Sequence, residues 1–327
     1  MKSLVTGGAG FIGSHLVDAL AARGDDVLVL DDFSSGKREN LAGALDAGVE
    51  VAEVDVADAR AMFEAVAAFQ PQSVFHLAAQ IDVRRSMADP GFDAHLNVVG
   101  TVNALELARR AKAAKFVFTS TGGAIYGEGA ERLDELPFAE SARCEPFSIY
   151  GQSKFAAEGY IDLYARTRGL SATVLRLGNI YGPRQDPATE AGVVAIFCEA
   201  GRDGGRPTVF GTGEQTRDYV HVADVVAALL AAEASDDAGP INVGTAVETS
   251  VLELAGLVGS AFGRGDFEPE FAPAREGEVE RTVLDTSAAA ERLGWRAERT
   301  IETGLEQTIE AEAAEPFGGV RGSQPRP

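Results

Sequence analysis

A glycine cluster near the start of the chain is the feature that most restricts the fold. From Gly7 the chain reads Gly-Gly-Ala-Gly-Phe-Ile-Gly, between the apolar run Ser3–Thr6 and a helical pattern over residues 11–23. The spacing G-x-G-x-x-G falls on Gly8, Gly10 and Gly13. Glycines between a strand and a helix permit a tight turn and close approach of the backbone to a pyrophosphate. The pattern therefore predicts a βαβ unit that binds a dinucleotide at the N-terminus of its first helix.

An acidic pair after the next strand pattern indicates which dinucleotide. Asp31 and Asp32 end the apolar run 26–30, eighteen residues after Gly13. A carboxylate at this place can accept hydrogen bonds from both ribose hydroxyls and repels a 2′-phosphate, which favours NAD over NADP. Asp55, at the end of the third strand pattern, is a further candidate for contact with adenine. The alternative is that the glycines only form a turn and that the acidic pair caps a loop.

Strand and helix patterns alternate through the first half of the chain. Apolar runs predict strands at 3–6, 26–30, 50–54, 73–77, 115–120 and 172–177, and helical patterns lie at 11–23, 59–69, 92–113 and 150–168. This alternation predicts an α/β fold with a Rossmann-type doubly wound parallel sheet over residues 1–178. The weaker pattern over 179–315 predicts a smaller C-terminal α/β substrate lobe, with some segments returning to the first domain. Residues 316–327 are expected to form a disordered tail.

A tyrosine and a lysine four residues apart form the second chemical pattern. Tyr150 and Lys154 begin the helical pattern 150–168, so they share one face of a helix. A nearby ammonium favours the phenolate over the phenol and prepares Tyr150 to act as a base. Ser120 and Thr121, at the end of the fifth strand pattern, can hold the oxygen of a reacting alcohol. The alternative is an ordinary pair on a helix surface.

Composition excludes several classes of partner. Lys and Arg total 29 and Asp and Glu total 50, so the formal net charge is −21. Such an excess disfavours binding to nucleic acid or to an anionic membrane. The chain has no apolar run near the ~20 residues that span a bilayer and no apolar leader, so we expect a cytoplasmic protein. The two cysteines, Cys144 and Cys198, lack metal-ligand spacing, and we expect no metal site.

Ordered motifs across residues 2 to 312 resemble those of the extended short-chain dehydrogenase/reductases. The motifs are TGGAGFIGSH, LDD, HLAAQ, NVVGT, STGGAIYGE, YGQSK, RLGNIYGPRQ, FGTGEQTRDYVHV, NVGT and REGEVERTVLD. Within this superfamily the chain is most similar to nucleotide-sugar epimerases that interconvert UDP-glucose and UDP-galactose. The resemblance implies NAD as cofactor and a UDP-sugar as substrate.

The resemblance also assigns residues around the cofactor. It places Gly7, Gly10, Phe11 and Ile12 at the pyrophosphate and Asp31, Asp32, Phe33, Ser35 and Gly36 around the ribose. It places Asp55 and Val56 at the adenine and Leu77, Ala78, Ala79 and Gln80 along the cofactor cleft. Asn97 is expected to make structural or cofactor-side hydrogen bonds.

The same resemblance assigns the reaction and the substrate site. Tyr150 would take the proton of the sugar 4-hydroxyl, Lys154 would hold the nicotinamide ribose, and Ser120 and Thr121 would bind the 4-oxygen. A 4-keto sugar would then turn in the site and be reduced on its other face. The nucleotide-sugar contacts implied are Asn179, Arg217 and Arg275 at the diphosphate and Thr208 and Phe210 at the uracil, with Arg184 as a further candidate.

Three questions of specificity and assembly remain open at this point. Related dehydratases and decarboxylases carry an acidic residue where this chain has Gly122 and Gly123, which favours simple epimerisation. The small Thr282 stands where a bulky residue restricts some epimerases, so N-acetylated sugars are expected to fit. Alternatives are a UDP-glucuronate 4-epimerase, another nucleotide-sugar epimerase or dehydratase, and a non-enzymatic NAD-binding sensor or assembly factor. We expect a homodimer through the helices at 92–113 and 150–168.

Overall fold

A seven-stranded parallel sheet forms the centre of the molecule. The computed structural model describes residues 1–188, 192–275 and 279–314. The strand order is β10-β6-β5-β4-β1-β2-β3, and every neighbouring pair is parallel. The strands are β1 (Lys2–Thr6), β2 (Asp26–Asp31), β3 (Glu50–Glu53), β4 (Ser73–His76), β5 (Lys115–Thr121), β6 (Ala172–Leu177) and β10 (Gly239–Val243). The predicted Rossmann-type sheet is confirmed, and its winding reverses between β1 and β4, where ligands of such sheets bind.

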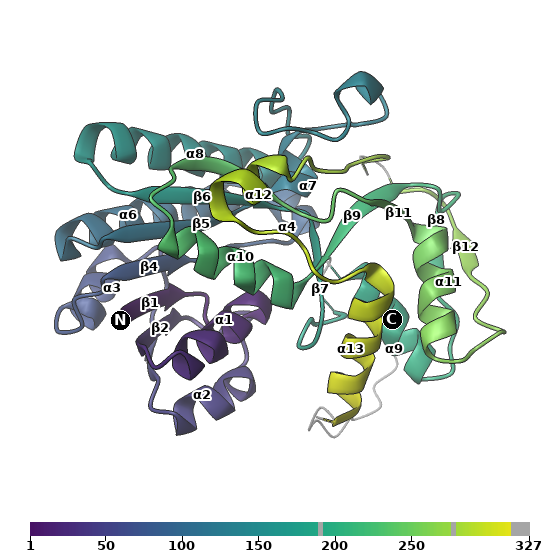
Figure 1. Cartoon of the computed structure of the whole chain (residues 1–327), viewed down its shortest axis with the longest axis horizontal. Coiled ribbons are helices and arrows are strands. Elements are labelled where there is room, and N and C mark those ends of the chain that lie inside the picture. Colours follow the sequence, from purple (N-terminus) through teal and green to yellow (C-terminus); the bar gives the residue numbers. More distant parts are fainter. Residues whose placement is uncertain (189–191, 276–278, 315–327) are drawn as a thin grey trace.

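Helices cover both faces of the sheet (Figure 1). One layer holds α3 (Ala59–Val66), α6 (Gly100–Ala111) and α8 (Ile149–Arg168). The other layer holds α1 (Phe11–Ala22), α2 (Ala42–Asp46), α10 (Val222–Ala234) and α12 (Ser287–Leu293). The shorter helices α4 (Val83–Ala88), α5 (Pro90–Ala94) and α7 (Gly122–Ile125) and the 3-10 turns η1 (Arg38–Leu41) and η3 (Leu133–Glu135) lie in the connections. No helix in the described ranges is long and apolar enough to cross a membrane.

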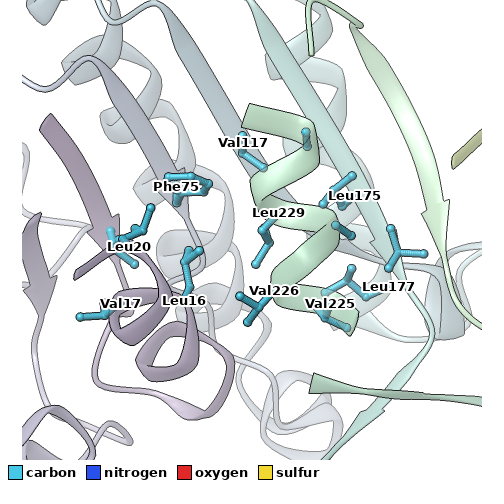
Figure 2. Close-up of a cluster of buried hydrophobic side chains, with 14 of the residues drawn as sticks. Leu16, Val17, Leu20, Phe75, Val117, Leu175, Leu177, Val225, Val226 and Leu229 are labelled. Carbon is cyan, nitrogen blue, oxygen red and sulfur yellow. The ribbon is translucent and has the colours of Figure 1, made fainter. Parts of the chain in front are cut away.

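The core beneath α1 and α10 joins the two halves of the chain. Figure 2 shows Leu16, Val17 and Leu20 of α1 beside Val225, Val226 and Leu229 of α10, all packed against Phe75, Val117, Leu175 and Leu177 of the sheet. Burying one such side chain contributes about 1.5–3 kcal/mol, so this layer binds α10 firmly to the sheet. The sheet unit thus contains β10, α10 and α12, which follow residue 178 in the sequence.

A smaller lobe is built from the other elements after residue 178. It has a three-stranded sheet with the order β11-β9-β7 and a two-stranded sheet of β12 and β8. Its elements are β7 (Asn179–Tyr181), α9 (Val193–Arg202), β8 (Thr208–Phe210), β9 (Thr216–His221), β11 (Glu248–Ser250), α11 (Val251–Ala261), β12 (Glu270–Ala272) and α13 (Ile301–Ala314). A separate apolar cluster holds the lobe together. The predicted tail at 316–327 lies outside the described residues.

The helix expected at 92–113 is present, but a π-helical turn interrupts its regular geometry. The chain runs without a break through α5, the π-helical turn η2 (His95–Val99) and α6, which ends at Ala111. The side chain of Asn97, inside η2, bonds to Gln80 and Ser153 rather than facing solvent. Single π-turns inside α-helices are frequent at functional sites. Periodicity cannot detect such a turn, because the apolar pattern continues through it.

The glycine cluster leads to a stability prediction. A Cβ on Gly13 would overlap the carbonyl oxygen of Gly7 and lie 2.8 Å from the Cα of Gly8. Gly13→Ala should therefore cost about 2 kcal/mol or more, because backbone must move to make room. Gly256→Ala is the matched control, since open space surrounds this exposed glycine of α11. It should stabilise the protein by about 0.5–1 kcal/mol. Denaturant unfolding measures both, and equal effects would contradict the packing argument.

Candidate active site

One large cavity opens at the carboxyl ends of the central strands. Its volume is about 1110 Å³, and it is lined by the ends of β2, β4, β5 and β6 and by residues of the smaller lobe. Pockets for one small ligand usually measure ~300–1,000 Å³, so this cavity lies just above the upper end of that range. Sheet and lobe therefore build a single site together.

The cavity brings together most of the residues predicted from the sequence. On the cofactor side its lining includes Gly7, Gly10, Phe11, Ile12, Asp31, Asp32, Ser35, Gly36, Asp55, Val56, Leu77, Ala78 and Ala79. On the reaction and substrate side it includes Ser120, Thr121, Tyr150, Lys154, Asn179, Arg184, Thr208, Phe210, Arg217 and Arg275. Four predicted residues do not line it, namely Phe33, Gln80, Asn97 and Thr282.

The dinucleotide end has the properties that a pyrophosphate requires. Helix α1 begins after Gly10, and no side chain caps its first turn. Its free N–H groups and its positive end border the cavity. Gly7 has φ +70°, and a Cβ there would lie 2.7 Å from the backbone nitrogen of Ala78. These residues fit a dinucleotide, because a bare helix start faces the cavity and the glycine loop keeps side chains out of it.

Asp31 holds the glycine loop to the end of β2. Its Oδ2 accepts a hydrogen bond from the Ala9 nitrogen at 2.9 Å, and its Oδ1 accepts one from the Phe33 nitrogen at 2.9 Å. Burial raises the pKa of Asp31. Asp32 accepts hydrogen bonds from Ser34. Phe33 has φ +56° and packs its ring under Arg38, which explains why Phe33 does not line the cavity.

The tyrosine and lysine of the predicted pair meet the end of β5. Ser148 caps α8 by accepting a hydrogen bond from the Gly151 nitrogen, so the helix begins at Ile149. Burial raises the pKa of Tyr150 to about 12, and a hydrogen bond with the Thr121 hydroxyl acts in the opposite direction. Burial lowers the pKa of Lys154 to about 7, partly opposed by the negative charges of Glu158 and Asp93. The Lys154 ammonium lies 4.0 Å from the ring centre of Phe118.

Ser120 is held by a buried ion pair that the sequence analysis did not identify. Its Oγ donates a hydrogen bond of 2.5 Å to Glu158, whose carboxylate also accepts two-pronged hydrogen bonds from Arg176. Arg176 donates further to Tyr126, whose hydroxyl bonds to Asn242 on β10. The proton of Ser120 is thus directed away from the cavity, while its lone pairs remain available. Glu158 follows Lys154 by one helical turn, a spacing that could have revealed it.

Gln80 and Asn97 act behind the cavity wall rather than at it. The Asn97 side chain accepts a hydrogen bond from the Gln80 nitrogen at 2.8 Å and donates to the Gln80 carbonyl at 3.0 Å. It also donates to Ser153 Oγ at 3.0 Å, and Ser153 donates to the Tyr150 carbonyl. The two residues therefore tie the segment after β4 to the first turn of α8.

The substrate end carries two arginines and an aromatic side chain. The Arg275 guanidinium lies 3.8 Å from the ring centre of Phe210, and Arg217 donates to the Thr216 carbonyl at 2.8 Å. Thr282 is only 2% exposed and packs beside Thr216 instead of reaching the cavity. The size of residue 282 therefore does not directly set the room in the cavity for an N-acetyl group.

A segment after β7 reaches back to the dinucleotide end. Lys37 and Asp186, which both line the cavity, form an ion pair of 2.8 Å. Arg184 pairs with Asp18 of α1 at 2.8 Å, and the Pro183 carbonyl lies 2.9 Å from His15 Nε2. No motif predicts these contacts, because they join residues far apart in the sequence.

Fold and cavity together define a class of protein. A Rossmann-type sheet with a bare helix start, next to a Tyr-x-x-x-Lys pair with a buried lysine, is the architecture of an enzyme that pairs a dinucleotide with a hydroxyl-bearing substrate. The chain belongs to the NAD dependent epimerase/dehydratase family, whose model matches residues 3–244.

Relatives and solved structures are similar to this chain over almost its whole length. A UDP-glucose 4-epimerase of Mycolicibacterium smegmatis is 46% identical over 312 residues, which cover 95% of this chain and 98% of that protein. The UDP-glucose 4-epimerase of Thermotoga maritima, solved with UDP-glucose, is similar with a TM-score of 0.91, 44% identity and coverage of 96% and 99%. The Thermus thermophilus UDP-glucose 4-epimerase in complex with NAD has a TM-score of 0.89, 41% identity and coverage of 96% and 100%.

The buried ion pair leads to a prediction about stability. Arg176→Met would leave the Glu158 carboxylate buried without its partner, which should cost about 3–5 kcal/mol. The double variant Glu158→Gln/Arg176→Met removes both charges and should recover much of that loss. Unfolding free energies of both variants test this, and a double variant as unstable as the single one would refute the charge explanation.

Proposed function

We propose that the protein is a UDP-glucose 4-epimerase, an isomerase that interconverts UDP-glucose and UDP-galactose with NAD as its cofactor. The observation that carries the proposal is the placement of Tyr150, Thr121 and Lys154 in one cavity with the bare start of α1 and the arginines of the lobe. One end of this cavity suits a dinucleotide, the other suits a nucleotide diphosphate, and the hydroxyl chemistry lies between them. The high identity to epimerases over the full chain supports the same activity.

The proposed reaction needs one proton-transfer group and a fixed donor beside it. When bound, NAD supplies the reversible oxidation and reduction at C4 of the sugar. Tyr150 Oη takes the proton of the 4-hydroxyl and later returns it to the same oxygen. Lys154, as an ammonium, lowers the free energy of the Tyr150 phenolate. The hydroxyl of Thr121 stabilises the Tyr150 phenolate through its hydrogen bond with Tyr150, while Ser120, whose proton is held by Glu158, offers the sugar oxygen only an acceptor.

The packing around two glycines explains why the proposed reaction stops at epimerisation. Elimination of a neighbouring hydroxyl requires an acid or base side chain just after β5. A Cβ at Gly122 would lie 2.6 Å from a methyl carbon of Leu284, and one at Gly123 would lie 3.1 Å from the side-chain oxygen of Asn179. Leu284 and Asn179 thus occupy the space that an additional acidic side chain would need. This favours a 4-epimerase over a dehydratase.

The proposed substrate contacts use the cations of the lobe. Arginine's planar guanidinium suits the oxygens of a diphosphate, so Arg217, Arg275 and Asn179 would hold that part of the substrate. Thr208 and Phe210 would flank the uracil. Acetylated hexosamines and UDP-glucuronate remain further candidate substrates.

The turnover prediction separates the proposed enzyme from a non-enzymatic NAD-binding protein. Wild-type protein should interconvert UDP-glucose and UDP-galactose in an NMR assay, whereas Tyr150→Phe should lose at least about 10²-fold in kcat, because its proton-transfer group is gone. Mass spectrometry should find NAD in both proteins. The same assay with UDP-glucuronate and the N-acetylhexosamine pair defines the preferred sugar. Undiminished turnover in Tyr150→Phe, or a wild type that binds NAD without turnover, would overturn the proposal.

We further propose the organisation of the protein in the cell. A dinucleotide unit comprises residues 1–178 with β10, α10 and α12, and the rest of 179–315 forms the substrate lobe.

The cysteines Cys144 and Cys198 are free thiols, as in a reducing compartment, in line with a cytoplasmic location. Phe155 and Leu163 lie two helical turns apart on α8 and are 37% and 43% exposed. Exposed apolar side chains on a long helix suit an interface between two copies of the chain.

The homodimer leads to a prediction about mass in solution. Leu163→Glu should convert a dimer to a monomer, because a carboxylate in an apolar interface loses its hydration. Val247→Glu is the control, since Val247 is 58% exposed but lies on the smaller lobe. Light scattering after gel filtration measures the mass. A monomeric wild type, or a dimer that Leu163→Glu leaves intact, would exclude this interface.

A further inference from the structure

A buried carboxylate lies behind the Tyr150–Lys154 pair and has no part in the proposed reaction. Asp93, in α5, is 0% exposed. Its Oδ1 accepts hydrogen bonds from Gln80 Nε2 at 3.1 Å and from Asn97 Nδ2 at 3.3 Å. Its Oδ2 is buried without a hydrogen-bond partner among the described residues. A buried carboxylate with an unsatisfied oxygen is costly and calls for a compensating interaction.

The charges around Lys154 leave Asp93 as its natural counterpart. Glu158, the other buried carboxylate that acts on Lys154, is already matched by the two-pronged hydrogen bonds of Arg176. Asp93 has no ion pair within the described ranges, and neither has Lys154, which is only 3% exposed. An isolated buried charge costs several kcal/mol of solvation, so the two opposite charges stabilise each other across the site.

Hydrogen bonds keep Asp93 at a fixed position relative to α8. Asn97 joins Asp93 to Ser153, the residue before Lys154, and Ser153 bonds to the Tyr150 carbonyl. Both α5 and η2 pack directly on α8. The carboxylate is therefore built into the wall behind the pair and cannot swing into solvent.

We propose that Asp93 is a positioning residue for the reaction, the buried counter-charge that keeps Lys154 an ammonium while Tyr150 transfers its proton. Its effect on turnover rests on the proposed function, whereas its effect on Lys154 does not. Asp93 acts through Lys154 and Tyr150 and touches neither substrate nor cofactor.

The titrating groups around the pair determine the sign of the expected effect. Asp93 and Glu158 both oppose the lowering of the Lys154 pKa by burial, and Asp93 also raises the pKa of Tyr150. His76 of β4 stays uncharged at neutral pH, since burial and the charge of Lys154 lower its pKa to about 3. Removing the charge of Asp93 should lower the pKa of both Lys154 and Tyr150. Both limbs of the pH profile for kcat should then move to lower pH.

The direct test follows the ammonium of Lys154 by NMR in the NAD-loaded protein. The chain has five lysines, so ε-carbon signals are few, and Lys154→Arg assigns the relevant one. In Asp93→Asn the pKa of Lys154 should fall by about one pH unit, as expected for the loss of a nearby opposite charge. Asp93→Glu, which keeps the charge, should retain a pKa close to that of the wild type. If Asp93→Asn does not fold, Asp93→Ser removes the same charge from a smaller side chain.

Asp224→Asn is the control for a merely structural effect. Asp224, on α10, is nearly as deeply buried as Asp93. Its carboxylate forms an ion pair of 2.6 Å with Arg299. Its loss should lower Tm without moving the Lys154 titration. An unchanged Lys154 pKa in Asp93→Asn or Asp93→Ser would overturn the proposal. A shifted Lys154 pKa in a protein that does not epimerise UDP-glucose would support the counter-charge and reject the proposed function.

Discussion

The burial of charge where β5 meets α8 is the constraint on which the rest of the site depends. Lys154, Glu158, Arg176 and Asp93 are all at most 8% exposed. Each buried charge needs an opposite charge or hydrogen bonds to remain ionised. The bonds that supply them extend from Ser120 through Glu158 and Arg176 to Tyr126 and β10. The chemistry of Tyr150 therefore also depends on Glu158, Arg176 and Asp93, which do not line the cavity.

Much of the sheet could be predicted, because strand and helix patterns are local. Apolar runs located β1 to β6 to within two residues, and the glycine spacing located the start of α1. The π-turn at 95–99 and the return of β10 to the main sheet could not be predicted in the same way. The first depends on Asn97 bonding to distant residues, and the second depends on the pairing of Ile241 with Leu175.

In the candidate site, too, local motifs predict some residues, whereas contacts between residues far apart in the sequence are not predicted. Motifs led to Tyr150, Lys154, Thr121 and the glycine loop, which all border the cavity. They also led to Phe33 and Thr282, whose positions in a motif say nothing of where their side chains point. The Lys37–Asp186 ion pair became visible only in three dimensions, whereas the helical spacing of Glu158 from Lys154 is present in the sequence. The net charge of −21 repels an anionic diphosphate on average. The positive charges of Arg217 and Arg275 must therefore attract the diphosphate locally.

The most direct test of the proposed reaction follows the hydrogen at C4 of the sugar. UDP-glucose deuterated at C4 is incubated with the purified protein without added NAD, and the UDP-galactose formed is examined by NMR and mass spectrometry. If Tyr150 moves only the hydroxyl proton and the carbon-bound hydrogen returns to C4, the product keeps its deuterium. Exchange of that deuterium with solvent, release of water from the sugar, or no interconversion at all would contradict the account.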